Sequence, residues 1–203
     1  LAAPVCALIN TSVRQCVVPR QWKARVAPLP KRLPVSDIET DIRPISVTCP
    51  VSKVAEYFMS RMFDEHFDEL TDDCQFGSVS GRSTTLALVK FSHMLFESSD
   101  DSSNIIRVLF VDFSKAFDLI NHNVISDKLV ANHFSVGFST WFLSFLTERS
   151  QFVKIGENIS DSRTINAGAP QGTRAGPNAF KLLVNDLVCK TACIKYVDDL
   201  TIA

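Results

Sequence analysis

Two adjacent aspartates near the end of the printed sequence restrict how that part of the chain can fold. The motif Tyr196-Val197-Asp198-Asp199 lies between two short apolar stretches, 192–194 and 200–203. Neighbouring carboxylates repel each other, so a fold keeps both at the tip of an apolar hairpin only where a cation offsets the repulsion or both groups reach water. Two interpretations follow: a divalent-metal site, or a solvated turn, because Asp is a common turn residue.

A third carboxylate favours the metal site. Asp112 ends another apolar run, 105–111, and two buried strands that each end in Asp would bring hard oxygen ligands together. Mg²⁺ is satisfied by one or two carboxylates, waters and substrate phosphates. Two such ions about 3.5–4 Å apart serve the attacking and leaving oxygens in polymerases and nucleases. We therefore expect Asp112 and Asp198 to bridge two Mg²⁺ ions, with Mn²⁺ as the alternative metal, and Asp199 to tune the site.

The segment after Asp112 fits a nucleotide pocket. In Phe113-Ser114-Lys115-Ala116-Phe117, the second aromatic ring follows the first by about one turn. Phe117 could pack beneath a sugar or belong to the ordinary core, and the sequence leaves both interpretations open.

The composition indicates one globular domain without a membrane-spanning helix. The chain has 203 residues, of which 46% are hydrophobic, and a net charge of −1, which by itself does not indicate a nucleic-acid partner. Arg107 and Lys181 interrupt the best candidates for a membrane span. The six cysteines show no CxxC spacing and are expected to be free, mostly buried thiols. No histidine stands near Cys189 and Cys193, so a zinc site is not expected.

The charges are unevenly distributed along the chain. A basic first segment could follow a phosphate backbone or form a solvated face, and both interpretations stay open. Its residues, which all precede Asp37, are Arg14, Arg20, Lys23, Arg25, Lys31 and Arg32.

The apolar spacing predicts helices that alternate with paired strands. We expect helices over about 4–18 and 121–130, and further helices around Trp141 and Phe180. Prolines predict extended chain from about 28 to 46. Segments 152–155 and 162–165 are predicted to form a β-hairpin. Without the regular rhythm of a parallel sheet, this order indicates an α+β domain with a small antiparallel sheet.

Another long amphipathic helix and a loop rich in small residues lie in the first half. Ser52 is the expected N-cap of the helix after Pro50. Loop 75–83 could hold a phosphate through backbone N–H groups, or it could be an ordinary turn with a Ser cap. The expected buried residues of the first helix are Val54, Phe58, Met59, Met62, Phe63 and Phe67, and those of the helix after the loop are Leu86, Leu88, Val89 and Phe91.

Five motifs in one order resemble the reverse transcriptase domain of non-LTR (LINE-type) retrotransposons. One match would be weak, but five in register are specific, and similarity around Trp22-Lys23 extends the resemblance over nearly the whole chain. The motifs are Arg43-Pro44-Ile45-Ser46, Gln75-Phe76-Gly77 with Gly81-Arg82-Ser83-Thr84-Thr85, Val111-Asp112-Phe113-Ser114-Lys115-Ala116-Phe117-Asp118, Gly168-Ala169-Pro170-Gln171-Gly172 with Gly176-Pro177, and Tyr196-Val197-Asp198-Asp199.

The resemblance implies a right-hand polymerase fold and RNA-directed DNA polymerisation. Helical fingers would span about 1–103 and 121–168, and a small antiparallel palm sheet about 104–120 and 169–203. The partners would be an RNA template, a DNA primer and dNTPs. The chain begins with Leu1 and stops soon after Leu200, so we expect a fragment truncated before the thumb, with little processive synthesis of its own.

The resemblance also implies roles for single residues. Asp112 and Asp198 would ligate two Mg²⁺ ions, and Asp199 would complete the triad. The implied substrate-binding residues are Phe113 and Phe117 at the nucleotide, with Phe117 at the sugar 2′ position, Gln171 and Gly172 beside nucleotide and template, and Arg43 and Lys53 near the triphosphate, where phosphoryl transfer needs positive charge.

Two departures from the family pattern concern packing. Arg174-Ala175 and Lys181 stand where the family usually shows aliphatic residues, so we expect altered packing beneath the Gln171 loop and an unaffected metal site.

Two other functions compete with polymerisation. One is a truncated remnant that binds nucleic acid without turnover. The other is a metal-dependent nuclease or other phosphotransferase, which would leave Phe117 and the Gln171 loop without a role. The sequence gives no oligomeric state and no targeting signal, although an element of this kind would act inside the cell and meet chromosomal DNA in the nucleus.

Overall fold

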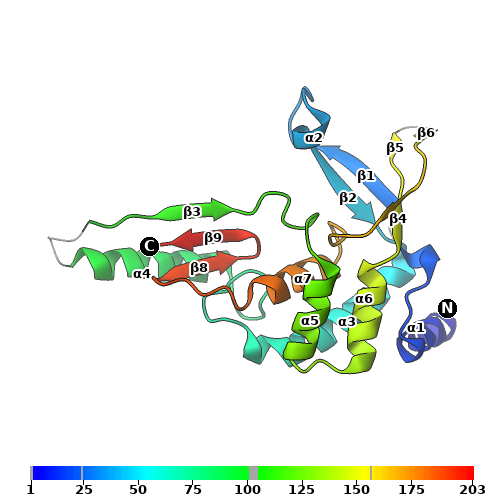
Figure 1. The fold of residues 1–203 in the computed structure, drawn as a ribbon, viewed down its shortest axis with the longest axis horizontal. Helices are drawn as coiled ribbons and strands as arrows, with labels where there is room; N and C mark the ends of the chain where they lie inside the picture. Colours follow the sequence, from blue (N-terminus) through cyan, green and yellow to red (C-terminus); the bar gives the residue numbers. More distant parts are fainter. Residues whose placement is uncertain (1, 24, 101–104, 156) are drawn as a thin grey trace.

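The chain forms an elongated molecule with a small sheet at one end and a group of helices at the other (Figure 1). This computed structural model describes residues 2–23, 25–100, 105–155 and 157–203. The expected boundary between fingers and palm near 103–104, and the Gly156 position of the expected hairpin, lie outside the described residues. None of the described helices is long and apolar enough to cross a membrane.

The element order mixes helices and short strands throughout. The helices are α1 (Ala2–Gln15), η1 (Arg20–Trp22), α2 (Ile38–Asp41), α3 (Pro50–Phe67), η2 (Asp68–Leu70), α4 (Thr84–Ser99), α5 (His122–Ala131), α6 (Val136–Leu146) and α7 (Ala175–Val184). The strands are β1 (Arg25–Pro30), β2 (Ile42–Val47), β3 (Leu109–Asp112), β4 (Arg149–Gln151), β5 (Lys154–Ile155), β6 (Asn158–Ile159), β7 (Arg163–Ile165), β8 (Cys193–Tyr196) and β9 (Asp199–Ile202).

The described strands pair only in antiparallel fashion, as the α+β prediction requires. β3, β9 and β8 form a three-stranded sheet in that order, while β1 and β2 form a separate hairpin. The predicted pairing of 152–155 with 162–165 is wrong. β5 pairs with β6, and β4 pairs with β7. The local β5–β6 pairing closes a shorter loop and so loses less chain entropy.

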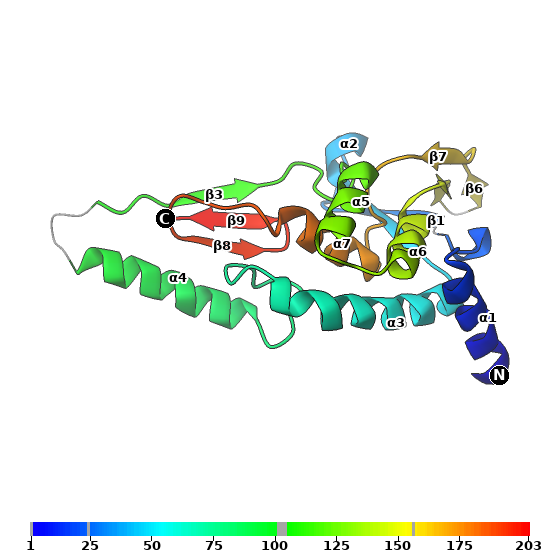
Figure 2. The ribbon, with the colours of Figure 1, turned by 60° about the horizontal axis from the view of Figure 1, so that its bottom comes forward.

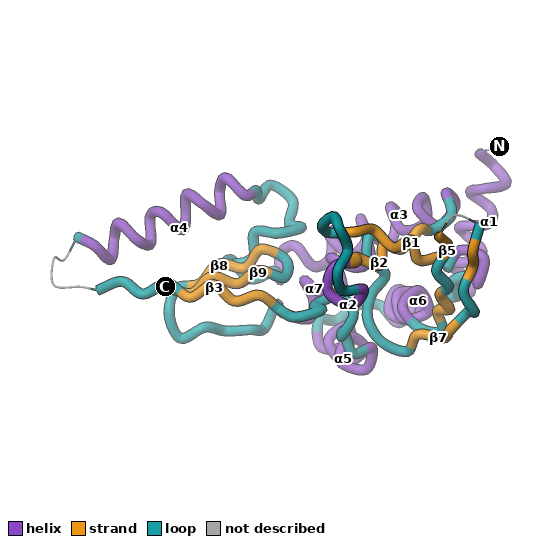
Figure 3. The backbone as a smooth tube through the Cα atoms, turned by 90° about the horizontal axis from the view of Figure 1, so that it is seen from above, coloured by secondary structure: helices purple, strands orange, loops and turns teal. Residues whose placement is uncertain are grey.

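α3 and α4 run one after the other along the lower side of the view in Figure 2, and α1 extends lower still at the N-terminus. α4 runs below the three-stranded sheet, and α3 runs below α5, α6 and α7. Seen from above, the β1–β2 hairpin and β5 lie at the helical end, away from the three-stranded sheet (Figure 3).

Stacked aromatic rings fill the core between α3 and α6. Phe63 on α3 stacks on Phe134 with ring centroids 5.2 Å apart, and Phe134 stacks on Phe138 at 5.0 Å. Trp141 and Phe145 on α6 stack at 5.9 Å. These rings are almost fully buried, and each large aromatic side chain contributes much apolar area to the core.

The predicted buried face of α3 is confirmed for Met59, Phe63 and Phe67 and wrong for Val54, Phe58 and Met62. Ala55, Met59, Phe63 and Phe67 are buried, and their spacing of four makes one straight stripe. Met62 belongs to the neighbouring stripe, which faces solvent, together with Val54 and Phe58, which is 52% exposed. The N-cap is Cys49, whose sulfur accepts a hydrogen bond from the Ser52 N–H, and Pro50 takes the first helical position. Ser52 lies inside the helix.

The expected buried strand before Asp112 is also wrong. β3 begins only at Leu109, and Phe110 is 72% exposed. β3 is an edge strand with a single neighbour, β9, so its side chains have little to pack against in the described part of the chain. α4 likewise buries only Ala87 and Met94.

Smaller differences concern single side chains. Leu86, Leu88 and Val89 on α4 are exposed. All six cysteines are free, as predicted, but only Cys193 is buried.

Candidate active site

Three carboxylates converge at one end of the β3–β9–β8 sheet. β8 and β9 form a hairpin whose turn contains Val197 and Asp198. β3 pairs with β9 so that Asp112 stands directly opposite Asp199. The short edge strand, the hairpin and the antiparallel register therefore bring together residues that are more than eighty positions apart in the sequence.

The electrostatics reflect this convergence. Burial raises the pKa of Asp199, and the neighbouring charges of Asp198 and Asp112 raise it further. Like charges raise a carboxyl pKa only when they are close enough to interact. A cation at this position would remove that repulsion.

The donor set fits a hard divalent cation that shares its ligands with a substrate. No group of three or more His, Cys, Asp or Glu side chains among the described residues is arranged to hold a metal ion by itself. Mg²⁺ does not require such a cage, because it keeps waters and binds through one or two carboxylates plus phosphates. Asp112 and Asp198 line one cleft and supply the two carboxylates.

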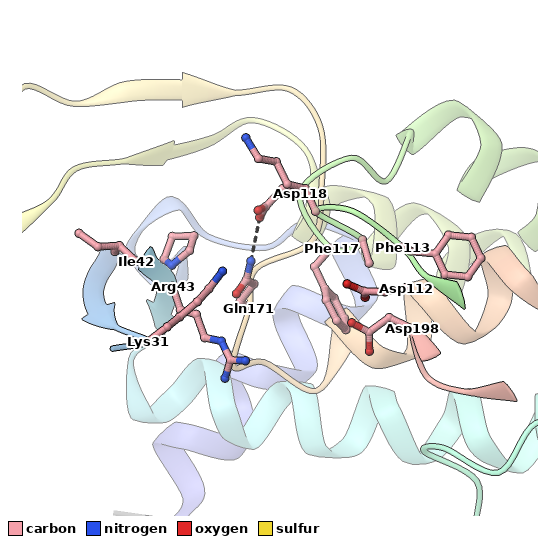
Figure 4. Close-up of a pocket in the computed structure, with 12 residues that line it drawn as sticks. Lys31, Ile42, Arg43, Asp112, Phe113, Phe117, Asp118, Gln171 and Asp198 are labelled. Carbon is pink, nitrogen blue, oxygen red and sulfur yellow. Dashed lines mark hydrogen bonds between the residues drawn. The ribbon is translucent and has the colours of Figure 1, made fainter. Parts of the chain in front are cut away.

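That cleft is about 520 Å³ in volume and has walls of opposite charge. Asp112 and Asp198 lie beside the Phe117 ring, while Arg43 and Lys31 reach in from the β1–β2 hairpin (Figure 4). The lining residues are Lys31, Ile42, Arg43, Pro44, Asp112, Phe113, Lys115, Ala116, Phe117, Asp118, Gln171 and Asp198.

The loop 168–172 passes between the segment after Asp112 and strand β2. Gly168 has φ +75°, and a Cβ there would lie 2.7 Å from the Asp118 carbonyl oxygen, so only glycine fits. Gln171 Nε2 donates to Asp118 Oδ1 at 3.0 Å, and the Ser46 N–H donates to the Gln171 carbonyl at 2.7 Å. These two hydrogen bonds hold Gln171, which lines the cleft (Figure 4).

Phe117 both lines the cleft and packs against α7. Its ring centroid lies 5.6 Å from that of Phe180, and a Cβ on Gly176 would contact its ring at 3.6 Å. Phe113 meets Phe180 edge to face at 5.7 Å. One side of Phe117 therefore belongs to the core and the other side to the cleft.

Lys53 and Gly172 do not lie in this cleft. They line a second cleft of about 510 Å³ together with Tyr57 and Arg174. The Arg174 guanidinium lies 5.2 Å from the centroid of the Tyr57 ring, and Tyr57 meets Phe58 edge to face at 5.5 Å. Arg43 and Lys53 were both predicted to lie near one triphosphate, but they line two separate clefts.

The loop before α4 ends in a Ser cap, which agrees with the interpretation of this loop as an ordinary turn. The Ser83 side chain accepts a hydrogen bond from the Leu86 N–H at the start of α4. The segment at the other end of this loop, Gln75-Phe76-Gly77, contacts the hairpin that carries Asp198.

The sequence did not assign the charged residues Lys31, Lys115 and Asp118 to the nucleotide site, although all three line the cleft. Lys31 belongs to the basic first segment, and Lys115 and Asp118 lie inside the Asp112 motif, so all three belong to segments that the sequence singles out. Their position in the cleft depends on the hairpin and the 168–172 loop, which the sequence alone does not place.

The packing difference expected at Lys181 lies between α7 and the C-terminal part of α3. It is 1% exposed and pairs with Asp64 at 3.2 Å and Asp68 at 3.1 Å. Its ammonium group also lies 5.2 Å from the centroid of the Phe63 ring. A cation therefore joins α7 to α3 where the family usually has an aliphatic contact.

The family model described as "Reverse transcriptase (RNA-dependent DNA polymerase)" matches residues 29–203. The chain belongs to this family. It is 28% identical over 200 residues to the "Probable RNA-directed DNA polymerase from transposon BS" of Drosophila melanogaster, covering 94% of this chain and 22% of that protein. It is also 28% identical over 192 residues to the corresponding protein of the X-element, covering 89% of this chain and 20% of that protein. The chain thus spans about a fifth of the length of these relatives, and the resemblance to non-LTR reverse transcriptases is confirmed.

Solved structures support the fold. The apo telomerase from Candida tropicalis, truncated from its C-terminal domain, matches with a TM-score of 0.60 and 12% identity, covering 91% of this chain and 44% of that one. The Candida albicans telomerase in complex with a TWJ fragment of telomeric RNA matches with a TM-score of 0.61 and 12% identity, covering 96% of this chain and 41% of that one. The predicted right-hand polymerase fold is confirmed.

Proposed function

We propose that this chain carries the polymerisation centre of an RNA-directed DNA polymerase of a non-LTR retrotransposon. In the reaction, a primer 3′-hydroxyl attacks the α-phosphorus of a dNTP, and pyrophosphate leaves. One observation carries the proposal: Asp112 and Asp198 line the same cleft as the cations Lys31 and Arg43. Phosphoryl transfer requires carboxylates that bind metal ions and, opposite them, cations that bind the phosphates.

Asp112 and Asp198 would hold two Mg²⁺ ions, with Mn²⁺ as the alternative, and Asp199 would complete the acidic group. When bound, the ions supply charge neutralisation and activation of the attacking oxygen. The carboxylates would hold the ions at the end of the sheet. Burial, together with repulsion from Asp198 and Asp112, raises the pKa of Asp199, and that repulsion favours cation binding there.

The basic wall and the aromatic ring of the cleft would bind the nucleotide. Arg43 and Lys31 would contact the triphosphate, because both cations face the cleft that contains the carboxylates (Figure 4). Phe117, with Phe113 beside it, would pack against the sugar. Gln171 would border the base, since its side chain is held by Asp118 at 3.0 Å.

The second cleft would receive the template. It combines the cations Lys53 and Arg174 with the exposed ring of Tyr57, and single-stranded nucleic acids bind to such combinations of charge and stacking surfaces. Gly172 lines this cleft while Gln171 lines the first, so adjacent residues would separate the template from the nucleotide.

The division into polymerase subdomains is part of the proposal. Residues about 1–103 and 121–168 would act as fingers, and residues about 104–120 and 169–203 as palm. This assignment puts the basic hairpin β1–β2 in the fingers and the three carboxylates in the palm.

The test is template-dependent dNTP incorporation by the complete natural protein that contains this chain. Asp198→Asn removes the metal-binding negative charge but keeps the shape of the side chain. It should lower incorporation by at least about 100-fold, while the thermal unfolding curve stays close to wild type. Asp127→Asn, on the outer part of α5, is the matched control and should keep full activity.

Each rival function has its own outcome in this assay. Full activity of Asp198→Asn would refute the catalytic assignment. RNA binding without any incorporation by the wild-type protein would favour the inactive remnant. Metal-dependent cleavage of the template in place of primer extension would favour the nuclease.

A further inference from the structure

The side chain of Gln75 is buried against the turn that carries Asp198. Gln75 is 1% exposed. Its Oε1 accepts hydrogen bonds from the Gly77 N–H at 2.9 Å and from the Val197 N–H at 3.2 Å. Both partners are donors, so the amide oxygen must face them.

The backbone around Gln75 is attached to the same hairpin. The Phe76 N–H donates to the Lys195 carbonyl at 2.7 Å, and the Lys195 N–H donates to the Cys74 carbonyl at 2.7 Å. These bonds make a parallel bridge beside β8. The segment therefore supports β8 from the side opposite β9.

The turn needs such support because of Val197. Its φ is +56°, in the left-handed region, where a β-branched residue is strained by about 1–3 kcal/mol. A Cβ on Gly77 would lie 2.4 Å from the Val197 nitrogen, so Gly77 lets the backbone approach the turn closely. The strained conformation persists because Gln75 satisfies the Val197 N–H inside this contact.

The other end of the Gln75 amide points to a role beyond stability. Gln75 Nε2 is buried and has no hydrogen-bond partner within the described residues, which costs about 1–3 kcal/mol. A side chain selected for packing alone would avoid that cost. The part of the Gln75 amide that makes hydrogen bonds is its oxygen, which accepts from the N–H of Val197, the residue before Asp198.

We propose that Gln75 is a positioning residue that sets the orientation of Asp198 for metal binding through the Val197 N–H. The proposal rests on the metal-binding role given to Asp198 above. Loss of the Gln75 acceptor would let the turn relax, so that Asp112 and Asp198 no longer present their oxygens to the same ion.

The test compares two substitutions of similar size. Gln75→Met removes the strong acceptor, whereas Gln75→Glu keeps an oxygen at that position. In the complete natural protein, Gln75→Met should lower kcat by about 10- to 100-fold and raise the Mg²⁺ concentration for half-maximal activity several-fold, with the KM for dNTP nearly unchanged. Gln75→Glu should recover most of both losses. Gly77→Ala, which would displace Val197 directly, should raise the Mg²⁺ requirement as Gln75→Met does.

A control variant at an equally buried residue distinguishes a positioning role of Gln75 from a purely structural one. Lys181→Met removes two buried ion pairs and the hydrogen bond from Lys181 to the Ser78 carbonyl at 3.1 Å, but it leaves the Gln75 oxygen and its bond to the Val197 N–H in place. It should therefore lower the melting temperature and leave the Mg²⁺ requirement unchanged. If Gln75→Met changes the Mg²⁺ requirement no more than Lys181→Met does, Gln75 is only structural and the proposal is wrong.

Two readouts do not depend on polymerase activity. Gln75→Met should speed hydrogen exchange at the Val197 amide and weaken Mn²⁺ binding measured by electron paramagnetic resonance, both relative to Lys181→Met. If Gln75→Met has the same Val197 hydrogen-exchange rate and the same Mn²⁺ affinity as the wild-type protein, the positioning role is wrong. Failure of the wild-type protein to incorporate dNTPs would instead count against the proposed function alone.

Discussion

Gly168 and Gly81 have almost the same backbone conformation in very different surroundings. Their φ values are +75° and +74°, but a Cβ on Gly168 would meet the Asp118 carbonyl at 2.7 Å, whereas nothing lies within 4 Å of a Cβ on Gly81. Gly81→Ala should therefore cost only backbone strain, about 1 kcal/mol. Gly168→Ala should cost about 3 kcal/mol or more, because the clash is added to the strain.

Chemical denaturation of the two alanine variants measures this difference. Gly168→Ala should also lower dNTP incorporation, since it pushes the Gln171 loop away from Asp118. Equal losses of stability in the two variants would mean that the close approach at Gly168 contributes nothing.

Arg43 and Lys53 offer a second comparison of single residues. They line different clefts, so their alanine variants should have different kinetic effects. Arg43→Ala should raise the KM for dNTP about 10-fold, because it removes a charge-assisted contact to phosphate. Lys53→Ala should leave that KM within about 2-fold and weaken template binding instead. Steady-state kinetics with varied dNTP and varied template separates the two, and an equal rise in the KM for dNTP would place both residues at the triphosphate.

The sequence predicted the convergence of the acidic residues better than the location of the basic ones. Asp112 ends β3, Asp198 lies in the turn between β8 and β9, and strand pairing brings these ends together. Lys53 lies on an exposed helix surface, and no local pattern tells which of two clefts that surface borders. Its location depends on how α3 packs beneath α7, which is a property of the whole core.

At the scale of elements, α3 shows why a helical pattern can be assigned to the wrong face. Its apolar residues form two neighbouring stripes, and both satisfy a spacing of four. The stripe with Phe63 packs against the rings of Phe134 and Phe142, while the stripe with Phe58 faces solvent and the second cleft. β3 was misjudged for a similar reason, because an apolar run does not reveal that it forms the edge of a sheet.

The buried cation between α3 and α7 gives a prediction with a pH dependence. Lys181→Met leaves Asp64 and Asp68 facing each other without their cation. Burial raises the pKa of Asp64, and Lys181 opposes that rise. A raised carboxyl pKa favours the folded state at low pH, and the benefit is lost as pH rises through the folded pKa. The variant should therefore lose about 2 kcal/mol at pH 7 and less as pH falls towards 5.

Denaturant unfolding at several pH values checks this expectation, and α3 itself provides the control. Arg61 and Glu65 form an exposed ion pair at 3.1 Å. Arg61→Met should leave the free energy of unfolding nearly unchanged, because an exposed ion pair is screened by solvent, and this should hold at both pH 5 and pH 7. A Lys181→Met loss that does not depend on pH would show that packing, not charge, is what Lys181 contributes.

On the scale of the whole molecule, the loop 168–172 separates two clefts of different character. The first contains the carboxylates and the cations of the β1–β2 hairpin, and the second contains aromatic rings and cations on α3 and at the start of α7. Because Gln171 and Gly172 line opposite sides of this division, a nucleotide in one cleft and a polynucleotide in the other would meet at the loop. The family resemblance implied this neighbourhood, but the second cleft itself appears only in three dimensions.

Binding of single-stranded RNA tests this arrangement. Tyr57→Ala and Phe58→Ala should each weaken binding by about 1–3 kcal/mol with an unchanged salt dependence, because stacking carries no net charge. Lys53→Ala should lower the slope of log K against log salt by about 0.7, the value for one phosphate contact on a single strand. Phe96→Ala is the control, since this ring is 70% exposed on α4, outside both clefts. Fluorescence anisotropy over a salt series distinguishes stacking from charge, and a Phe96→Ala loss equal to that of Tyr57→Ala would mean that RNA binds through exposed aromatic residues in general.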